Sequence, residues 1–106
     1  MSHAIFAYLK VPRDHQDRVA ARARDYGVEV RQEAGNLRFE IATNGAGEFF
    51  FWEEFDDRTA FETHAASHHV ADWRAFYEPF MIERRLEQIE PVTRPRKPFG
   101  AGPTRG

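Results

Sequence analysis

Cysteine is absent from this chain of 106 residues, which excludes disulfide bonds, thiolate metal sites and cysteine nucleophiles. An excess of charge of one sign is also lacking. The formal net charge is −2, and such a mixed surface does not favour nucleic acid or a membrane surface as a partner. No apolar run is long enough to cross a bilayer, and residues 1–11 lack the basic start and long apolar run of a signal peptide. We therefore expect a cytoplasmic protein.

Aromatic residues, by contrast, are abundant: the chain has 10 Phe, 3 Tyr and 2 Trp. Its length suits one domain, which buries roughly two thirds of its unfolded surface. Large aromatic side chains gather in cores, pockets and interfaces. We predict one domain over residues 1–91, followed by an irregular tail, residues 92–106, that is rich in Pro, Gly and Arg.

Hydrophobic periodicity and turn signals predict seven elements. Strands are expected at about 4–11, 37–42, 48–55 and 82–90, and helices at about 14–31, 57–66 and 68–79. Asp14 and Ser67 are candidate helix caps. Leu37, Phe39 and Ile41 alternate with charged residues, which is typical of a half-buried strand.

The order strand, helix, strand, strand, helix, helix, strand is typical of a split βαβ arrangement. It predicts an α+β, ferredoxin-like fold, in which a four-stranded antiparallel sheet carries its helices on one face. The strand at 48–55 has large aromatic side chains in both directions, so the uncovered face would expose a wide apolar patch. We predict a homodimer packed through this sheet face, with Glu54 as a candidate interface residue. The alternative is a monomer whose tail folds over that face.

Three short segments, taken together and in order, resemble one family. Residues 32–37 (QEAGNL) are similar to the E-P-G-N turn of the antibiotic biosynthesis monooxygenase (ABM) family. Residues 53–64 (EEFDDRTAFETH) resemble its E-x-Y-x-D-x-x-A-F-x-x-H signature, and residues 66–70 (ASHHV) resemble its A-S-P-H-F continuation. The similarity covers roughly residues 4–90. It implies a dimeric α+β barrel with a pocket between the sheet and the helices of each subunit.

The resemblance implies several chemistries, because the fold does not fix the reaction. Some relatives oxidise quinols or aromatic polyketides with O₂ and no cofactor, and others isomerise or cleave small metabolites. A haem-degrading branch uses an Asn, a Trp and a His, but here no Asn precedes Asn36, and His64 and Arg74 stand at the other two positions. Haem degradation is therefore not expected. His68 replaces the usual Pro and adds a titratable group near the presumed pocket mouth.

His64 is the main catalytic candidate. It follows Phe61 by three residues, so the two side chains share one face of a helix. A histidine on that face can act as a general base because its pKa lies near neutrality. Glu53, on the strand face of Phe51 and Phe55, is the predicted catalytic partner that orients the imidazole. The alternative is structural: His64 hydrogen-bonds Glu53 or the backbone and only ties helix to strand.

The predicted substrate-binding residues are Tyr8, Phe51, His69, Trp73 and Tyr77. Trp73 and Tyr77 share a helical face that forms either a pocket wall or core. The hydroxyl of Tyr8 either donates to a ligand carbonyl or belongs to a core or interface tyrosine.

A metal site is not predicted. His64 and His68 have a helical metal-ligand spacing, but no carboxylate is obviously placed as a third ligand, and the helix breaks near Ser67. No cofactor is expected either.

The leading hypothesis is a cofactor-independent monooxygenase that acts on a small aromatic or quinol-like substrate with O₂. The first alternative is an isomerase or lyase that uses the same His64 base on a small oxo-metabolite. The second alternative is a non-catalytic, dimeric ligand-binding domain.

Overall fold

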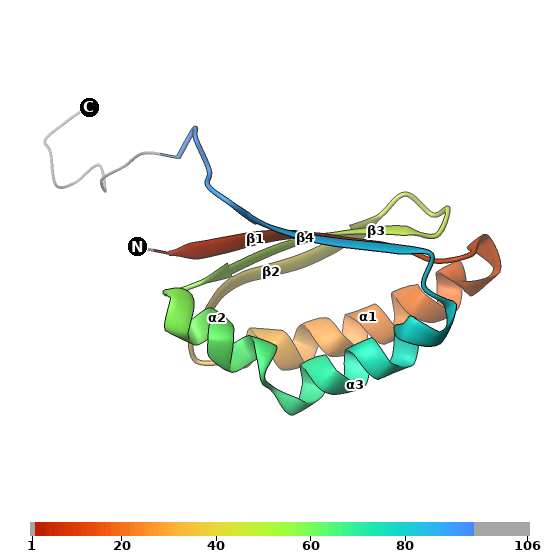
Figure 1. Ribbon diagram of the computed structural model, residues 1–106, viewed down its shortest axis with the longest axis horizontal. Helices are drawn as coiled ribbons and strands as arrows, with labels where there is room; N and C mark the ends of the chain where they lie inside the picture. Colours follow the sequence, from red (N-terminus) through yellow and green to blue (C-terminus); the bar gives the residue numbers. More distant parts are fainter. Residues whose placement is uncertain (1, 95–106) are drawn as a thin grey trace, which may run out of the picture.

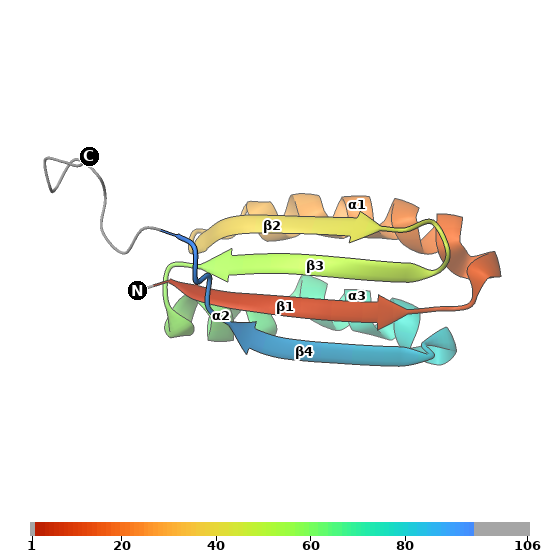
Figure 2. The ribbon, with the colours of Figure 1, turned by 90° about the horizontal axis from the view of Figure 1, so that it is seen from above.

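Four antiparallel strands form one sheet in the order β2-β3-β1-β4 (Figure 2). The strands are β1 (His3–Lys10), β2 (Asn36–Thr43), β3 (Glu48–Phe55) and β4 (Glu83–Ile89). The computed structural model describes residues 2–94. The four predicted strands are all present, and the two central ones are β1 and β3, which are apolar on both faces.

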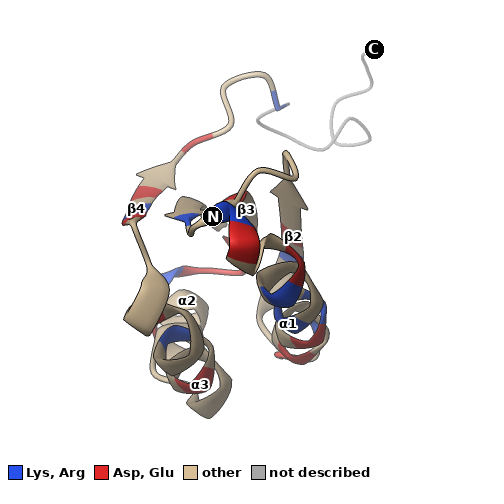
Figure 3. Cartoon of the chain, turned by 90° about the vertical axis from the view of Figure 1, so that its right-hand side faces the viewer, with Lys and Arg blue, Asp and Glu red and all other residues tan. Residues whose placement is uncertain are grey.

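All helices lie on one face of this sheet (Figure 1), so that sheet and helices form two layers when the molecule is viewed end-on (Figure 3). They are α1 (Gln16–Arg31), α2 (Arg58–Ala65) and α3 (His68–Tyr77), with short 3₁₀ turns η1 (Arg13–His15) and η2 (Glu78–Phe80). The predicted α+β, ferredoxin-like architecture is therefore confirmed. None of the described helices has both the length and the apolar character needed to cross a membrane.

The starts of α2 and α3 follow from their capping residues. The Asp57 carboxylate accepts the Ala60 backbone N–H at 2.9 Å, and Ser67 is the N-cap of α3. The prediction that Asp14 caps the first helix is wrong. The chain first closes a 3₁₀ turn, in which the His15 N–H donates to the Pro12 carbonyl at 2.9 Å, and α1 begins only at Gln16.

The core lies between the sheet and the helices. Residues of β1 and β3 with odd numbers face the helices, and Leu9 and Phe49, which pair across the two strands, are almost completely buried. The helices contribute the apolar faces of α1 and α3. The main core residues are Ala7, Leu9, Val11, Val19, Ala23, Tyr26, Val30, Phe39, Phe49, Phe51, Trp73 and Tyr77.

The other face of the sheet is partly apolar and has no helix over it. Phe50 and Trp52 are half-buried there, and the Arg38 guanidinium lies 5.7 Å from the centre of the Trp52 ring. Leu37 does not share the buried face of Phe39 as expected. A bulge between Asn36 and Arg38 breaks the alternation, and Leu37 is 56% exposed.

The start of the tail returns to this outer face. The Arg94 guanidinium donates to the Glu54 carboxylate, with Nη2 and Oε1 3.0 Å apart, and the Ser2 hydroxyl donates to it at 2.9 Å. These hydrogen bonds hold the pKa of Glu54 at about 2. Residues 92–94 are irregular, as predicted, and the rest of the predicted tail, 95–106, lies outside the described residues.

Gly47 and Gly45 form a matched pair for testing the β2–β3 loop. Both have positive φ, +88° and +81°, but a Cβ on Gly47 would lie 2.3 Å from the Val11 carbonyl oxygen, whereas nothing lies within 4 Å of one on Gly45. We expect Gly45→Ala to lower the free energy of unfolding by about 1 kcal/mol, and Gly47→Ala by at least about 2 kcal/mol more. Urea unfolding of both variants measures this, and equal losses would contradict the close approach of the loop to Val11.

Candidate active site

His64 is buried in the last turn of α2, with its side chain directed at the sheet. The residue is 4% exposed, and its ring lies 4.8 Å from that of Phe55 and 6.4 Å from that of Phe39, centre to centre. The Asp57 cap fixes the start of α2, so the helical spacing sets which face His64 occupies. A buried imidazole needs partners for its polar nitrogens.

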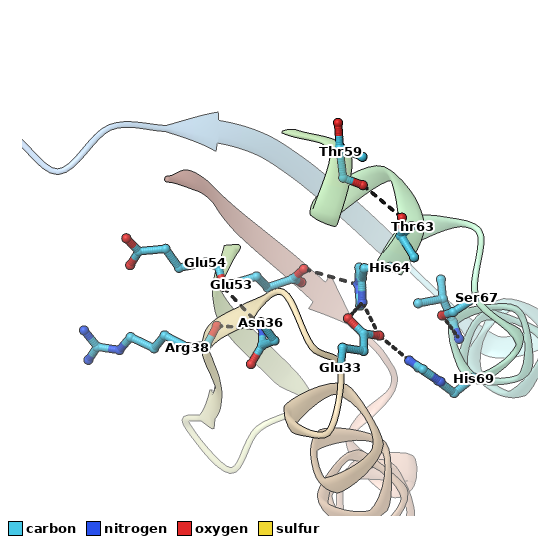
Figure 4. Close-up of polar contacts among 11 residues, drawn as sticks. Glu33, Asn36, Arg38, Glu53, Glu54, Thr59, Thr63, His64, Ser67 and His69 are labelled. Carbon is cyan, nitrogen blue, oxygen red and sulfur yellow. Dashed lines mark hydrogen bonds and ion pairs between the residues drawn. The ribbon is translucent and has the colours of Figure 1, made fainter. Parts of the chain in front are cut away.

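The first of these partners is Glu33, which sequence reasoning did not identify. The His64 Nδ1 atom lies 2.9 Å from Glu33 Oε2 and 3.1 Å from Oε1 (Figure 4). The His69 Nε2 atom also contacts Glu33 Oε2. One carboxylate therefore joins two histidines, from α2 and from the first turn of α3, to the end of α1.

Glu33 is held by its own turn. Its backbone N–H donates to the Val30 carbonyl at 3.0 Å, and its carbonyl accepts the Asn36 N–H at 3.1 Å. The residue belongs to the QEAGN segment, which the sequence predicted only as a turn. The glutamate at the head of that segment was the available signal.

Glu53 lies on the opposite side of the imidazole. Its Oε1 atom is 3.7 Å from His64 Nε2 (Figure 4), and the residue is 6% exposed on the inner face of β3. Two carboxylates thus flank the two nitrogens of one ring. The prediction that Glu53 orients His64 is corrected: the hydrogen-bonded partner is Glu33, and Glu53 is near the nitrogen that faces the sheet, beyond hydrogen-bond distance.

Burial controls the charge of both groups. Desolvation raises the pKa of Glu53 to about 7; Arg84 opposes the rise and Glu33 adds to it. Desolvation also lowers the pKa of His64, against the opposing effect of Glu33. At neutral pH His64 is therefore mainly uncharged. Because a carboxylate only accepts hydrogen bonds, the proton of the neutral ring is on Nδ1, and Nε2 carries a free lone pair.

A cavity of about 100 Å³ adjoins His64 and Glu53. Its wall is mainly aromatic, and the Tyr26 ring stacks on Trp73 with centres 4.9 Å apart. The exposed residues Arg74, Arg84 and Leu86 mark its opening to solvent. The lining residues are Ala7, Tyr8, Leu9, Tyr26, Phe51, Glu53, Phe61, His64, Ala65, Val70, Trp73, Arg74, Tyr77, Arg84 and Leu86.

Of the predicted substrate-binding residues, Phe51, Trp73 and Tyr77 line this cavity. The lining residues Tyr26 and Arg84 were not identified as candidates from the sequence. His69 does not line the cavity and instead reaches it indirectly, through its contact with Glu33.

Tyr8 borders the cavity, but its phenol lies on the other face of the sheet. The hydroxyl donates to Glu48, and the ring lies 5.5 Å from that of Phe50. The hydrogen bond to Glu48 raises the pKa of Tyr8 to about 12. The expectation that this hydroxyl donates to a ligand in the cavity is wrong, and the alternative of a core or interface tyrosine remains.

Glu33, His64 and His69 also form the set of described residues with metal-ligating geometry, since one donor atom from each lies within 4.8 Å of the others. The histidine expected at metal spacing, His68, is exposed and does not belong to this set. In this structure the same atoms contact one another directly, because the Glu33 carboxylate joins His64 Nδ1 and His69 Nε2.

Comparisons with known proteins agree with the family resemblance. The family model described as "Antibiotic biosynthesis monooxygenase" matches residues 2–75. Among solved structures, Rv0793 from Mycobacterium tuberculosis is 19% identical with a TM-score of 0.79 and covers 89% of this chain and 98% of its own. PA3566 from Pseudomonas aeruginosa is 18% identical with a TM-score of 0.77, and the match covers 87% of this chain and 95% of PA3566.

A Nitrosomonas europaea protein named for the same family is 21% identical, with a TM-score of 0.78, and covers 87% of this chain and 91% of its own. At these identities the likeness establishes the fold. No curated protein matches the chain.

The raised pKa of Glu53 makes stability depend on pH. A carboxyl whose folded pKa exceeds its unfolded value stabilises the fold fully below about pH 4.5, and this contribution is lost as pH rises through about 7. Glu53→Gln cannot ionise, so its stability relative to the natural protein should rise between pH 5 and pH 8, by on the order of 3 kcal/mol. Thermal unfolding at several pH values measures the difference. Glu62→Gln, on an exposed ion pair of α2, is the control and should show little change.

Proposed function

The chain belongs to the antibiotic biosynthesis monooxygenase family, and from this premise we propose that it is a cofactor-independent monooxygenase that oxidises a small aromatic or quinol-like substrate with O₂. The observation that carries the proposal is the position of the His64 imidazole between the Glu33 carboxylate and an aromatic cavity. Glu33 holds its Nδ1 at 2.9 Å, and its Nε2 lone pair adjoins an aromatic cavity. The fold alone would not select this reaction.

The first step is proton removal by His64. Its Nε2 accepts a phenolic or activated C–H proton from the substrate, and the imidazolium that forms is stabilised by Glu33 across the ring. His69 donates to the same carboxylate and so limits its motion. Glu53, whose pKa burial raises to about 7, is on the side of the ring where the substrate approaches and, in its protonated form, can return a proton later.

The second step is the reaction of the substrate anion with O₂. The phenolate transfers one electron to O₂, and recombination of the radical with superoxide at the ring CH carbon next to the oxyanion forms a peroxide at that carbon. Protonation of the peroxide by the His64 imidazolium and loss of water leave a carbonyl group. One oxygen atom enters the substrate and the other leaves as water, so no external reductant is needed.

The cavity suits this chemistry because it is small and largely apolar. Phe51, Trp73 and Tyr26 exclude water from the reacting atoms, which strengthens the electrostatic effect of Glu33 and protects reactive intermediates. A volume of about 100 Å³ is below the range of typical ligand pockets and favours a substrate with one ring.

A second candidate function is isomerisation or cleavage of a small oxo-metabolite without oxygen. It is favoured by the proximity of a neutral base, His64, and a carboxyl with raised pKa, Glu53, 3.7 Å apart. Such a pair can remove a proton from one carbon atom and deliver a proton to another. The requirement for O₂ separates the two candidates.

The assembly proposed for this site is a homodimer formed through the outer face of the sheet. Phe6, Phe50 and Trp52 lie together on the two central strands, and no described helix covers them. Aromatic surface of this kind is typical of interfaces. Arg94 and Glu54 lie on the same face, so this ion pair would adjoin the partner subunit.

Oxygen uptake with the simple quinol 1,4-dihydroxybenzene as substrate tests the mechanism. We expect His64→Gln and Glu33→Gln each to lower kcat/KM by about 100-fold, because the first removes the base and the second removes the group that orients it. His68→Gln, which changes an exposed histidine nearby, should retain full activity. Circular dichroism establishes that each variant is folded. Equal substrate consumption under argon would exclude the oxygenase, and an unchanged rate in His64→Gln would exclude His64 as the base.

The oligomeric state tests the sheet interface. Trp52→Glu introduces a charge on the outer face of β3 and should convert a dimer into a monomer in light scattering coupled to gel filtration. Val28→Glu is the control, because Val28 is 55% exposed on α1, away from the sheet, and should leave the dimer unchanged. A natural protein that elutes as a monomer would contradict the interface.

A further inference from the structure

Arg84 brings a positive charge to the cavity beside His64. Its position follows from the register of β4, in which Arg84 pairs with Leu9 and Leu86 pairs with Ala7. Leu9 and Ala7 face the helices, so Arg84 and Leu86 face them too, and both line the cavity. The neighbouring Arg85 faces the other way, with its guanidinium 4.8 Å from the centre of the Tyr8 ring.

Arg84 differs from its neighbours in having no carboxylate partner among residues 2–94. Arg74, at the same opening, is 3.3 Å from Glu78, and Arg85 is 3.4 Å from Glu83. No described carboxylate lies within ion-pair distance of Arg84. An arginine offers five N–H donors in a planar fork that matches a carboxylate. The Arg84 guanidinium hydrogen-bonds the Tyr77 hydroxyl, but at the mouth of a cavity a fork without a carboxylate partner is a binding group for an anion.

The rest of the cavity contains groups that suit the remainder of such a ligand. Tyr26 is 3% exposed, and its hydroxyl has no hydrogen-bond partner within the described part of the chain. Its ring stacks on Trp73, which with Phe51 supplies flat apolar surface for one aromatic ring. A buried hydroxyl without a partner is unfavourable in the empty cavity, so a polar substituent on a ligand would satisfy it.

The charge of Arg84 extends into the cavity. Burial raises the pKa values of Glu53, Tyr26 and Tyr77, and the charge of Arg84 opposes each of these rises. Below about pH 7, where Glu53 is mainly protonated, the cavity has a cation at its mouth and no compensating negative charge from Glu53. Such a field favours an anionic ligand over a neutral ligand of the same shape.

We propose that Arg84 forms an anion subsite at the mouth of this cavity, and that the ligand is a single-ring aromatic carboxylate that carries a hydroxyl group. The carboxylate binds the guanidinium, the ring packs against Phe51 and Trp73, and the hydroxyl reaches towards Tyr26 and His64. The identification of this ligand as the substrate rests on the proposed oxidation, whereas its binding at Arg84 does not.

Two probes that share one quinol ring test the subsite. 2,5-Dihydroxybenzoate carries a carboxylate, and 1,4-dihydroxybenzene does not. Their dissociation constants are measured with the full chain under argon, by isothermal titration calorimetry and by chemical shift changes in the aromatic region. We expect the acid to bind at least about 10-fold more tightly, with an affinity that falls as salt is added.

Arg84→Gln should remove this preference. It should weaken binding of the acid by about 10-fold and leave the affinity for the neutral quinol unchanged. Arg85→Gln is the matched control, because it removes the same charge from the adjacent residue on the opposite face, and it should leave both affinities unchanged at the same oligomeric state. Equal affinities for the two probes in the natural protein would overturn the subsite. An equal loss in Arg85→Gln would also overturn it, because the effect would then be one of net charge.

Phenyl phosphate separates carboxylate from phosphate as the anion. Because the cavity is small, we expect phenyl phosphate to bind more weakly than benzoate. If phenyl phosphate bound 10-fold more tightly than benzoate, the assignment of a carboxylate would be overturned. Failure of the subsite is distinguishable from failure of the oxidation. If the acid binds through Arg84 but consumes no O₂, the oxidation fails and the subsite stands. If both quinols are oxidised with equal KM, the subsite fails and the oxidation stands.

Discussion

The contact between the His64 imidazole and the Glu33 carboxylate is the constraint on which the rest of the site depends. A buried imidazole needs a partner for its N–H group, and Glu33 supplies it from the turn after α1. This turn is packed tightly against α2: a Cβ on Gly35 would lie 2.5 Å from that of Ala60. Because α1, α2 and the sheet meet here, the ring is held in one orientation, with Nε2 towards the cavity.

The two carboxylates beside His64 have different surroundings and therefore different roles. Glu33, whose side chain is 17% exposed, accepts from two imidazoles and so is held as an acceptor. Glu53 is more deeply buried and has no hydrogen-bonded cation, which is why burial raises its pKa to about 7. One carboxylate stabilises positive charge on the ring, and the other is able to hold a proton near neutrality. Pairs of groups whose environments differ in this way are typical of acid–base sites.

Much of the fold and part of the site could be predicted from the sequence, because periodicity determines which side chains share a face. The helical spacing of Phe61 and His64 and the strand spacing of Phe51 and Glu53 placed these residues correctly. Glu33 could not be placed, because it lies in a turn, where no period fixes the direction of a side chain, and it meets His64 across 31 residues of sequence.

Other errors have similar causes. The strand containing Tyr8 is apolar on both faces, so its alternation does not say which face the helices cover. A bulge reversed the expected exposure of Leu37. Arg84 lies on a strand with weak alternation, and only the pairing of β4 with β1 shows that it faces the cavity. Register and bulges are tertiary properties, set by strand pairing rather than by local sequence.

Burial of His64 favours proton abstraction in one respect and opposes it in another. It lowers the pKa of His64 and so keeps the base free at neutral pH, but it also penalises the imidazolium that forms when the base accepts a proton. Glu33 reduces this penalty, since an opposite charge 2.9 Å from Nδ1 acts strongly where water is excluded. An ionised Glu53 would also stabilise the imidazolium, from the Nε2 side. Its negative charge would, however, lie where the substrate approaches the Nε2 lone pair. The proposed base therefore depends on the difference between its two neighbours: Glu33 accepts hydrogen bonds at Nδ1, whereas burial raises the pKa of Glu53, beside Nε2, to about 7.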